Sequence, residues 1–243
     1  MFPKIVIPIT AGREQSKKLI QEAQKNNELI GIVSQKNANV EHPEGSDLYQ
    51  TGTIVRVIKT IKLPDGNTTV ITKGIQRFKI KKIVESQPYF RAEISKLTDT
   101  ASKNKEEYDA LLENIKDLAL KIIQLDPNIP NGANFAISNM AKGEEMLNFI
   151  CTNANFDASD KQILLEEKQI HKRAEKCYEM MLEDYKKLEL RNQIHQKTNK
   201  ELDKNQREYF LNQQIRTIQE ELGGGPESDV EDLKLKGENK NWS

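Results

Sequence analysis

The sequence predicts an α+β protein in which a small β-rich open barrel is followed by a helical bundle with a very long C-terminal helix. Most of residues 1–98 consists of short strand-like stretches, and over Thr53 to Leu63 apolar and polar residues alternate, as they do in half-buried strands. From Lys103 onward the apolar residues instead recur about every 3.6 positions, which is typical of helices. Five of the eight prolines also lie in residues 1–98, where they separate strands from one another.

The β-rich part is expected to contain short strands, one helix and one clear hairpin. Pro64, Asp65 and Gly66 predict the hairpin, because proline presets φ and glycine accepts a positive φ. Leu19, Ile20 and Ala23 form one apolar stripe at helical spacing. We therefore expect strands over 5–7, 29–33, 53–63, 70–83 and 89–94, and a helix over 12–27.

The helical part is expected to begin with a helix from Lys103 that ends at Asp126, because the residue before a proline avoids the helical region. Two short helices, over 135–140 and 146–150, are expected next. Between Gly143 and Gly223 there is neither glycine nor proline.

A new helix is predicted to start near Ser159, which forms a capping-box pattern with Gln162. If it runs over residues 161–222, it spans about 90 Å at 1.5 Å per residue. Its polar middle, His195 to Glu201, has no apolar seam. We expect that stretch to be solvated, hinged or packed against another chain.

Charge divides the chain at the place where the period changes. Residues 1–98 carry 16 basic and 9 acidic side chains, whereas residues 99–243 carry 21 and 28. We predict a β-rich module over 1–98, a helical bundle over 103–190, an extension of the long helix over 191–222, and a flexible linker with the start of a further module over 223–243.

The sequence lacks the common motifs of catalysis. No G-x-x-x-x-G-K-[ST], G-x-S-x-G or H-E-x-x-H pattern occurs, and the three histidines are scattered. The two cysteines fit no disulfide framework and no paired zinc motif, so we expect reduced thiols. No apolar run is long enough to cross a membrane. We expect a binding or assembly module with no catalytic, cofactor-binding or metal-binding residues.

Several segments, taken in order, form a pattern that a known family shares. The pattern begins with the strand Phe2 to Ile9 and the start of a helix at Gly12 to Ser16. It continues through Asp47 to Thr53, Leu63 to Gly66, Gly74 to Arg77, Gln206 to Ile215 and Ile218 to Gly223. Together these segments resemble the N-terminal region of bacterial Lon protease, an ATP-dependent serine protease. The order and spacing of these segments extend over essentially the whole chain.

The resemblance implies that the sequence is a piece of a longer enzyme, trimmed at its start and ending at Ser243 before the ATPase and serine–lysine protease modules. ATP and magnesium would belong to the absent ATPase module. The resemblance also implies a cytoplasmic homohexamer that degrades misfolded, damaged and short-lived regulatory proteins. This region would capture exposed hydrophobic segments of such proteins without hydrolysing anything itself, and no membrane partner is expected.

Bulky apolar residues are the candidates for contact with unfolded segments or with a partner, because accessible apolar side chains bind one another. Tyr209, Phe210 and Leu211 are adjacent and therefore point in different directions around a helix, so at least one is exposed or covered by a partner. The candidates on the sheet are Phe78, Tyr89 and Phe90, and those on the long helix are Tyr209, Phe210, Leu211, Ile215, Ile218 and Leu222.

Two other functions remain open at this stage. Arg77, Lys79, Lys81 and Lys82 cluster around Phe78, a combination of charge and stacking that weak nucleic-acid binding would use. Residues 161–222 alone would suit a coiled-coil scaffold, although that reading gives the β-rich module no role.

Overall fold

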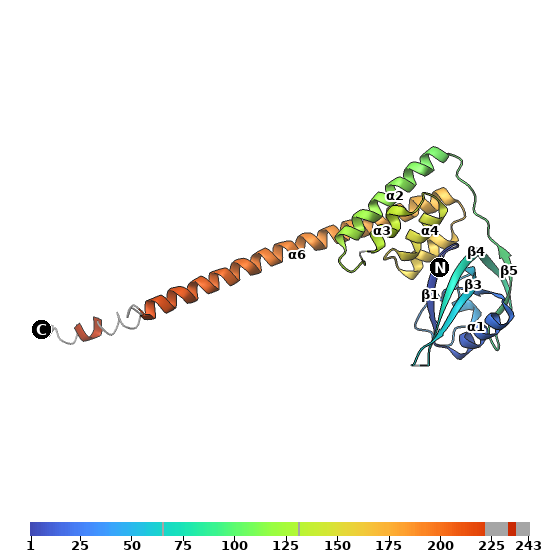
Figure 1. Ribbon diagram of the computed structural model, residues 1–243, viewed down its shortest axis with the longest axis horizontal. Helices are drawn as coiled ribbons and strands as arrows, with labels where there is room; N and C mark the ends of the chain where they lie inside the picture. The colour runs from blue at the N-terminus through green and yellow to red at the C-terminus, as the bar shows by residue number, and fades with distance from the viewer. Residues whose placement is uncertain (65, 131, 222–232, 237–243) are drawn as a thin grey trace. The chain divides into compact units, whose positions relative to one another are not determined.

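The computed structural model describes residues 1–64, 66–130, 132–221 and 233–236 (Figure 1). The chain divides into two units, Met1–Leu188 and Glu189–Ser243. The first unit contains an antiparallel sheet followed by helices, which confirms the predicted α+β class. Asp65 of the predicted hairpin, Leu222 and most of the predicted linker lie outside the described residues.

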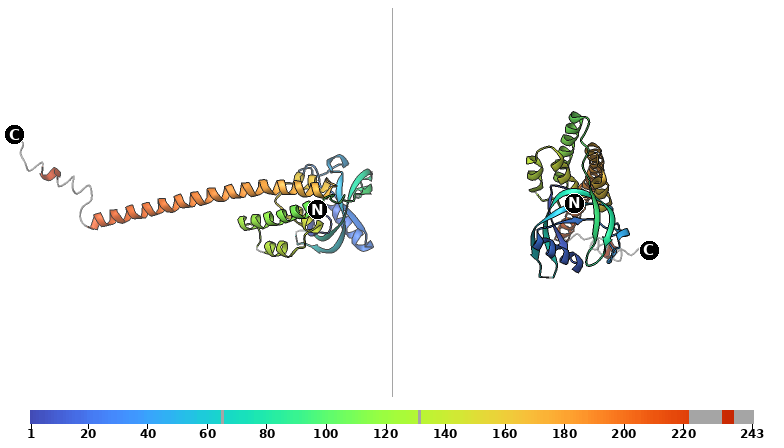
Figure 2. Two further views of the ribbon diagram at one scale, coloured as in Figure 1. Left: turned by 90° about the horizontal axis from the view of Figure 1, so that it is seen from above. Right: turned by 90° about the vertical axis from the view of Figure 1, so that its right-hand side faces the viewer.

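One long strand organises the sheet. β4 (Thr68–Glu85) pairs with β3 (Thr51–Lys62) along one edge. Its other edge pairs first with β1 (Val6–Ala11) and then with β5 (Arg91–Lys96). β2 (Leu29–Ile32) pairs only with β3. Because no described pairing joins β1 to β2, the sheet is open (Figure 2).

The helix expected over residues 12–27 is α1 (Glu14–Asn26), and it packs on the sheet through its apolar stripe. It ends at Asn27, whose left-handed φ of 53° lets its N–H bond the last carbonyls of the helix. Ile20 is buried with Ala11 and Val70 in a small core. The loop before β3 contains a short 3₁₀ turn, Gly45–Asp47.

Helices α2 to α6 follow the sheet in the part of the chain that the structure describes. α2 begins after Asn104, whose side chain accepts a hydrogen bond from the Glu107 N–H at 3.3 Å. The main core lies among these helices, and Phe2 and Ile5 from the start of the chain are buried in it. The helices are α2 (Lys105–Leu125), α3 (Gly132–Asn139), α4 (Glu144–Asn153), α5 (Ala158–Glu166) and α6 (Ile170–Glu221).

Sheet and bundle thus contribute to one core, and the predicted boundary at residues 98–103 falls inside the first unit. The division into a module over 1–98 and a helical bundle over 103–190 stays a prediction.

The expectation of one unbroken helix from about residue 161 is wrong. Helix α5 ends at Glu166 and α6 begins at Ile170, although no glycine or proline lies between them. The segment that connects β5 to α2 supplies the competing hydrogen bonds. Thr100 accepts from the Ile170 N–H at 3.1 Å and donates its own N–H to the Lys168 carbonyl at 2.8 Å.

The predicted capping box is also wrong. Asp157 occupies the N-cap position of α5, with no side-chain capping bond. Gln162 is instead buried, and its amide donates to the Thr51 carbonyl of β3 at 3.0 Å and to Glu166 at 2.8 Å. The Gln162 side chain, which was expected to cap the start of this helix, instead hydrogen-bonds the helix to the sheet.

In the second unit, the described residues from Glu189 to Glu221 are the C-terminal part of α6. The polar stretch His195 to Glu201 is helical and exposed, in line with the expected solvation. The described part of the chain contains no helix that is long and apolar enough to cross a membrane.

Candidate functional site

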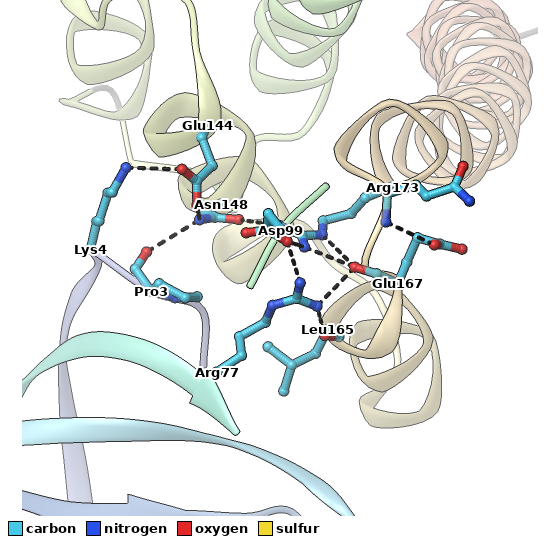
Figure 3. A network of polar contacts seen from close by, with 10 residues as sticks. Pro3, Lys4, Arg77, Asp99, Glu144, Asn148, Leu165, Glu167 and Arg173 are labelled. Atoms are coloured by element: carbon cyan, nitrogen blue, oxygen red, sulfur yellow. Dashed lines mark hydrogen bonds and ion pairs between the residues drawn. The ribbon is translucent and has the colours of Figure 1, made fainter. Parts of the chain in front are cut away.

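A buried polar network joins the sheet to the helices of the first unit (Figure 3). Arg77 projects from β4 and Arg173 from the start of α6, and they are 1% and 0% exposed. Both guanidinium groups donate to the same oxygen, Oδ1 of Asp99, which lies between β5 and α2. One carboxylate therefore faces two buried cations that come from different elements.

Main-chain carbonyls between α5 and α6 complete the surroundings of the two arginines. Arg77 donates to the carbonyl oxygens of Leu165 and Glu167, the second at 2.8 Å, and Arg173 donates to Glu167 at 2.8 Å. Burial, and then repulsion from Arg173, lowers the pKa of Arg77, while Asp99 acts in the opposite direction. Because an arginine side chain keeps its proton in proteins, this network is a structural joint and not an acid–base site.

The network continues into α4 and the start of the chain. Asn148 is fully buried, accepts from Arg173 at 3.4 Å and donates to the Pro3 carbonyl at 3.4 Å. One turn earlier in α4, Glu144 pairs with Lys4 at 2.9 Å. Burial raises the pKa of Glu144, but the hydrogen bond and charge of Lys4, together with the hydrogen bond to Asp99 and the charge of Arg173, leave that pKa lowered. The same joint thus holds the N-terminal segment against the bundle.

Phe78 lies in the core of the sheet. It is 3% exposed, and its ring fills the space above Gly31 and Gly52, where an added Cβ would come within 2.9 Å of the ring at either position. This packing corrects the expectation of a contact residue: Phe78 offers no exposed surface to a substrate.

Tyr89 and Phe90 precede β5 and are half-buried. The Tyr89 hydroxyl donates to Glu22 of α1 at 2.6 Å, and the Arg91 guanidinium lies 5.4 Å from the centre of its ring. Tyr89 is thus held in place, with one face of its ring covered by a cation. Val84, near the end of β4, is 57% exposed.

The candidates on α6 are all exposed within the second unit. Tyr209 is 68% exposed, and a shallow depression beside Tyr209, Phe210 and Ile218 also includes Gln213 and Gln214. Leu222, the last candidate, lies outside the described residues. The exposed candidates in the described part are Tyr209, Phe210, Leu211, Ile215 and Ile218.

The expected basic cluster is smaller than the sequence suggests. Lys79, Lys81 and Lys82 are exposed, but Arg77 is buried in the network with Asp99. A surface for anions could therefore use the three lysines alone.

A row of exposed side chains crosses four strands of the sheet. Val6 of β1 lies opposite Lys73 of β4, Lys73 lies opposite Arg56 of β3, and Arg56 lies opposite Leu29 of β2. All four are exposed, and we call them the sheet row. Ile75, two residues beyond Lys73, is also exposed. Apolar side chains thus stand near both ends of a row whose middle is cationic.

The described residues do not assemble a metal site. They contain no cluster of three or more histidine, cysteine or carboxylate side chains that could hold a metal ion. A shallow pocket of about 500 Å³ beside the α5–α6 break holds the Lys176–Glu167 ion pair at 2.7 Å.

The sequence reasoning missed the polar network, although one signal was available. Arg173 lies three residues after Ile170 and four before Cys177, so it falls on the apolar stripe of its helix. A charged residue on such a stripe needs a buried partner. The identity of that partner, Asp99, could not be found from spacing, because it lies 74 residues away.

The fold is that of N-terminal domains of Lon proteases. The N-terminal domain of a Mycobacterium avium complex Lon protease superposes with a TM-score of 0.59 at 17% identity, covering 74% of this chain and 91% of that one. A Lon N-terminal domain protein from Xanthomonas campestris gives a TM-score of 0.50 at 14% identity, covering 72% and 89%.

The sequence comparisons define the family. Residues 1–183 match the family model of the ATP-dependent protease La (LON) substrate-binding domain, and the chain belongs to this family. It is 41% identical to the Lon protease of Flavobacterium johnsoniae and 39% identical to that of Cytophaga hutchinsonii. Each alignment covers 100% of this chain but 30% of the relative. The chain thus spans 30% of the length of these relatives, and the region in common includes the substrate-binding domain.

Proposed function

We propose that this chain is the substrate-recognition and assembly region of an ATP-dependent serine protease. Its substrates are misfolded, damaged and short-lived regulatory proteins, which it binds through their exposed hydrophobic segments. The observation that carries the proposal is the match of residues 1–183 to a substrate-binding domain. The chain itself hydrolyses nothing, and bound segments pass to the ATPase and protease modules of a cytoplasmic homohexamer, where ATP and magnesium act.

The sheet row and Ile75 suit an unfolded segment. Val6, Leu29 and Ile75 are 51%, 47% and 41% exposed, so covering them removes apolar surface from water. Lys73 and Arg56 between them can donate hydrogen bonds to the carboxylates and main-chain carbonyls of an extended chain. A surface that combines side chains of both kinds binds many sequences without requiring one.

Tyr89 and Phe90 are a second proposed contact. Both are half-buried, and Tyr89 is oriented by Glu22 and Arg91, so its accessible edge is held in one position. A preorganised aromatic side chain loses little conformational freedom when it binds. Phe78 is not part of this proposal, because it is buried.

The exposed apolar residues of α6 are proposed as an assembly contact. Leu211, Ile215 and Ile218 recur at spacings of four and three, which places them on one side of the helix. Within their unit no described residue covers them. A neighbouring subunit or the ATPase ring is the proposed partner.

The proposal is tested by titrating the chain with one labelled polypeptide in two states, native and permanently unfolded, and following fluorescence anisotropy. We expect the unfolded form to bind at least tenfold more tightly, a difference of about 1.4 kcal/mol, with little dependence on salt. Equal affinity for the two states would contradict the proposal.

The alternative function is nucleic-acid binding, which the exposed Lys79, Lys81 and Lys82 favour. Because phosphate contacts release counterions, such binding falls steeply with salt. Binding of a single-stranded oligonucleotide that exceeds binding of the unfolded polypeptide, and that disappears between low and physiological salt, would support the alternative.

A further inference from the structure

Two thiols of the main core, which have no part in the proposed function, lie in direct contact. Cys151 in α4 and Cys177 in α6 are both free and fully buried. Their sulfur atoms are 3.6 Å apart, although the residues are 26 positions apart in the sequence. Met181, one turn further along α6, places its sulfur 3.8 Å from that of Cys177.

We propose that Cys151 and Cys177 are a modification site, at which peroxide converts the dithiol to a reversible intrachain disulfide between α4 and α6. A disulfide bond is about 2.05 Å long, so the sulfurs must approach by roughly 1.5 Å, which side-chain rotation and a small shift of the helices can supply. No third cysteine exists to compete with this pairing.

The surroundings distinguish the two thiols. The hydrogen bond that the Cys177 thiol shares with Cys151, and then burial, raises the pKa of Cys177 well above its ordinary value. Lys161 of α5 lies near Cys151: burial lowers the pKa of Lys161, and negative charge on Cys151 acts in the opposite direction. A nearby cation stabilises a thiolate, and the thiolate is the nucleophile in such reactions. Because its raised pKa keeps the Cys177 thiol protonated until the second step, we assign Cys151, the thiol beside Lys161, as the sulfur that reacts first.

The chemistry balances with hydrogen peroxide as the oxidant. The Cys151 thiolate attacks one peroxide oxygen, so an S–O bond forms, the O–O bond breaks, and hydroxide leaves to become water. Cys177 then attacks the sulfenic sulfur, an S–S bond forms, the S–O bond breaks, and the departing hydroxide takes the Cys177 proton as water. Overall, two thiols lose two electrons and two protons, and one peroxide becomes two waters.

The cross-link would lie beside the polar network. Asn148, one turn before Cys151, contacts Arg173, one turn before Cys177, at 3.4 Å. A bond between the sulfurs would tie the same two helices one turn further along. Oxidation would thereby fix the base of α6 to the bundle.

The test treats the 243-residue chain with hydrogen peroxide, blocks remaining thiols in denaturant, and measures intact mass and non-reduced peptides. We expect a mass lower by two hydrogen atoms and one peptide pair joining Cys151 to Cys177, both reversed by a dithiol reductant. Cys151→Ala and Cys177→Ala should each abolish the joined pair. Lys161→Gln should slow its formation several-fold, whereas the matched exposed change Lys121→Gln should not.

The wild-type chain alone decides the outcome, even where an alanine variant fails to fold. Recovery of both thiols in the reduced state at peroxide concentrations that oxidise a free small thiol would overturn the proposal. Sulfinic or sulfonic products without a joined peptide, or a disulfide only between two chains, would overturn it as well.

Discussion

Asp99→Asn is the change that tests the joint between sheet and bundle most sharply. The substitution keeps the size of the side chain and one oxygen, but it removes the one carboxylate that, among the described residues, contacts both Arg77 and Arg173. Because the two arginines are 1% and 0% exposed, while the Asp99 side chain is 23% exposed, water replaces the lost negative charge only in part.

Breaking a buried ion pair by removing one partner costs about 3–5 kcal/mol, since an uncompensated charge stays buried. Here one carboxylate serves two cations, and the carbonyls of Leu165 and Glu167 remain as acceptors. We therefore expect a loss of about 3–5 kcal/mol in the free energy of unfolding, and a melting temperature lower by roughly 10 °C for a domain of this size.

The assay is urea unfolding of the whole chain, which is monitored by circular dichroism and by hydrogen exchange of the amides of β4. Glu113→Gln is the matched control, because Glu113 pairs with Lys142 at 2.8 Å on the surface. An exposed pair of this kind contributes about 0–1 kcal/mol. A loss below about 1 kcal/mol for Asp99→Asn would contradict the claim that the Asp99 carboxylate stabilises the two arginines. It would show that the main-chain carbonyls and Asn148 are sufficient to hold them.

Four further predictions follow from sequence and structure. The chain should turn over neither ATP nor peptides, because it carries no phosphate loop or nucleophile motif; turnover well above background by clean protein would contradict this. Limited proteolysis should cut at Gly223–Gly225, where a glycine run meets Pro226; a resistant fragment running past Gly225 would show otherwise. The hydrogen bond with Lys176 lowers the pKa of Glu167. The stability that this ion pair contributes is therefore present above the ordinary glutamate pKa, and it is lost as the pH falls through the lowered pKa of the folded protein. Glu167→Gln should make the melting temperature depend less on pH below about pH 5, and an unchanged pH dependence would refute the assignment. In the complete enzyme, replacing both Leu211 and Ile215 with Asp should weaken assembly, measured by sedimentation, and slow degradation, whereas the control Gln206→Asp should do neither. The melting temperature of residues 1–188 should stay unchanged. A lower melting temperature with intact assembly would show that Leu211 and Ile215 belong to a local core.

Local patterns were sufficient to predict most elements of the fold. Alternation over 53–63 corresponds to β3, and the helical stripe from Lys103 corresponds to α2. The period of the apolar residues reports which side of an element is buried, and that is a local property. The break between α5 and α6 was not predictable in this way, because Thr100 and Arg77 displace its helical hydrogen bonds from distant parts of the chain.

The candidate site was predictable only in part, for the same reason. The exposure of Tyr209 and Phe210 follows from adjacent bulky residues on one helix. The burial of Phe78 depends on Gly31 and Gly52 in neighbouring strands, and the sheet row depends on the register of four strands. Register and long-range packing are set by the whole fold. The contact of Cys151 with Cys177 likewise requires two helices to be placed side by side.

The central claim, that the exposed face of the sheet binds unfolded polypeptide, is tested most directly by the double variant Val6→Asp with Ile75→Asp. The measurement is its affinity for a permanently unfolded labelled polypeptide, relative to the wild type and to Phe135→Asp. Phe135 is 76% exposed on α3, so its change is a matched loss of apolar surface elsewhere. Covering each half-exposed side chain contributes on the order of 1 kcal/mol, so the account predicts at least tenfold weaker binding by the double variant and wild-type binding by Phe135→Asp. Wild-type affinity in a double variant that melts like the parent would contradict the account.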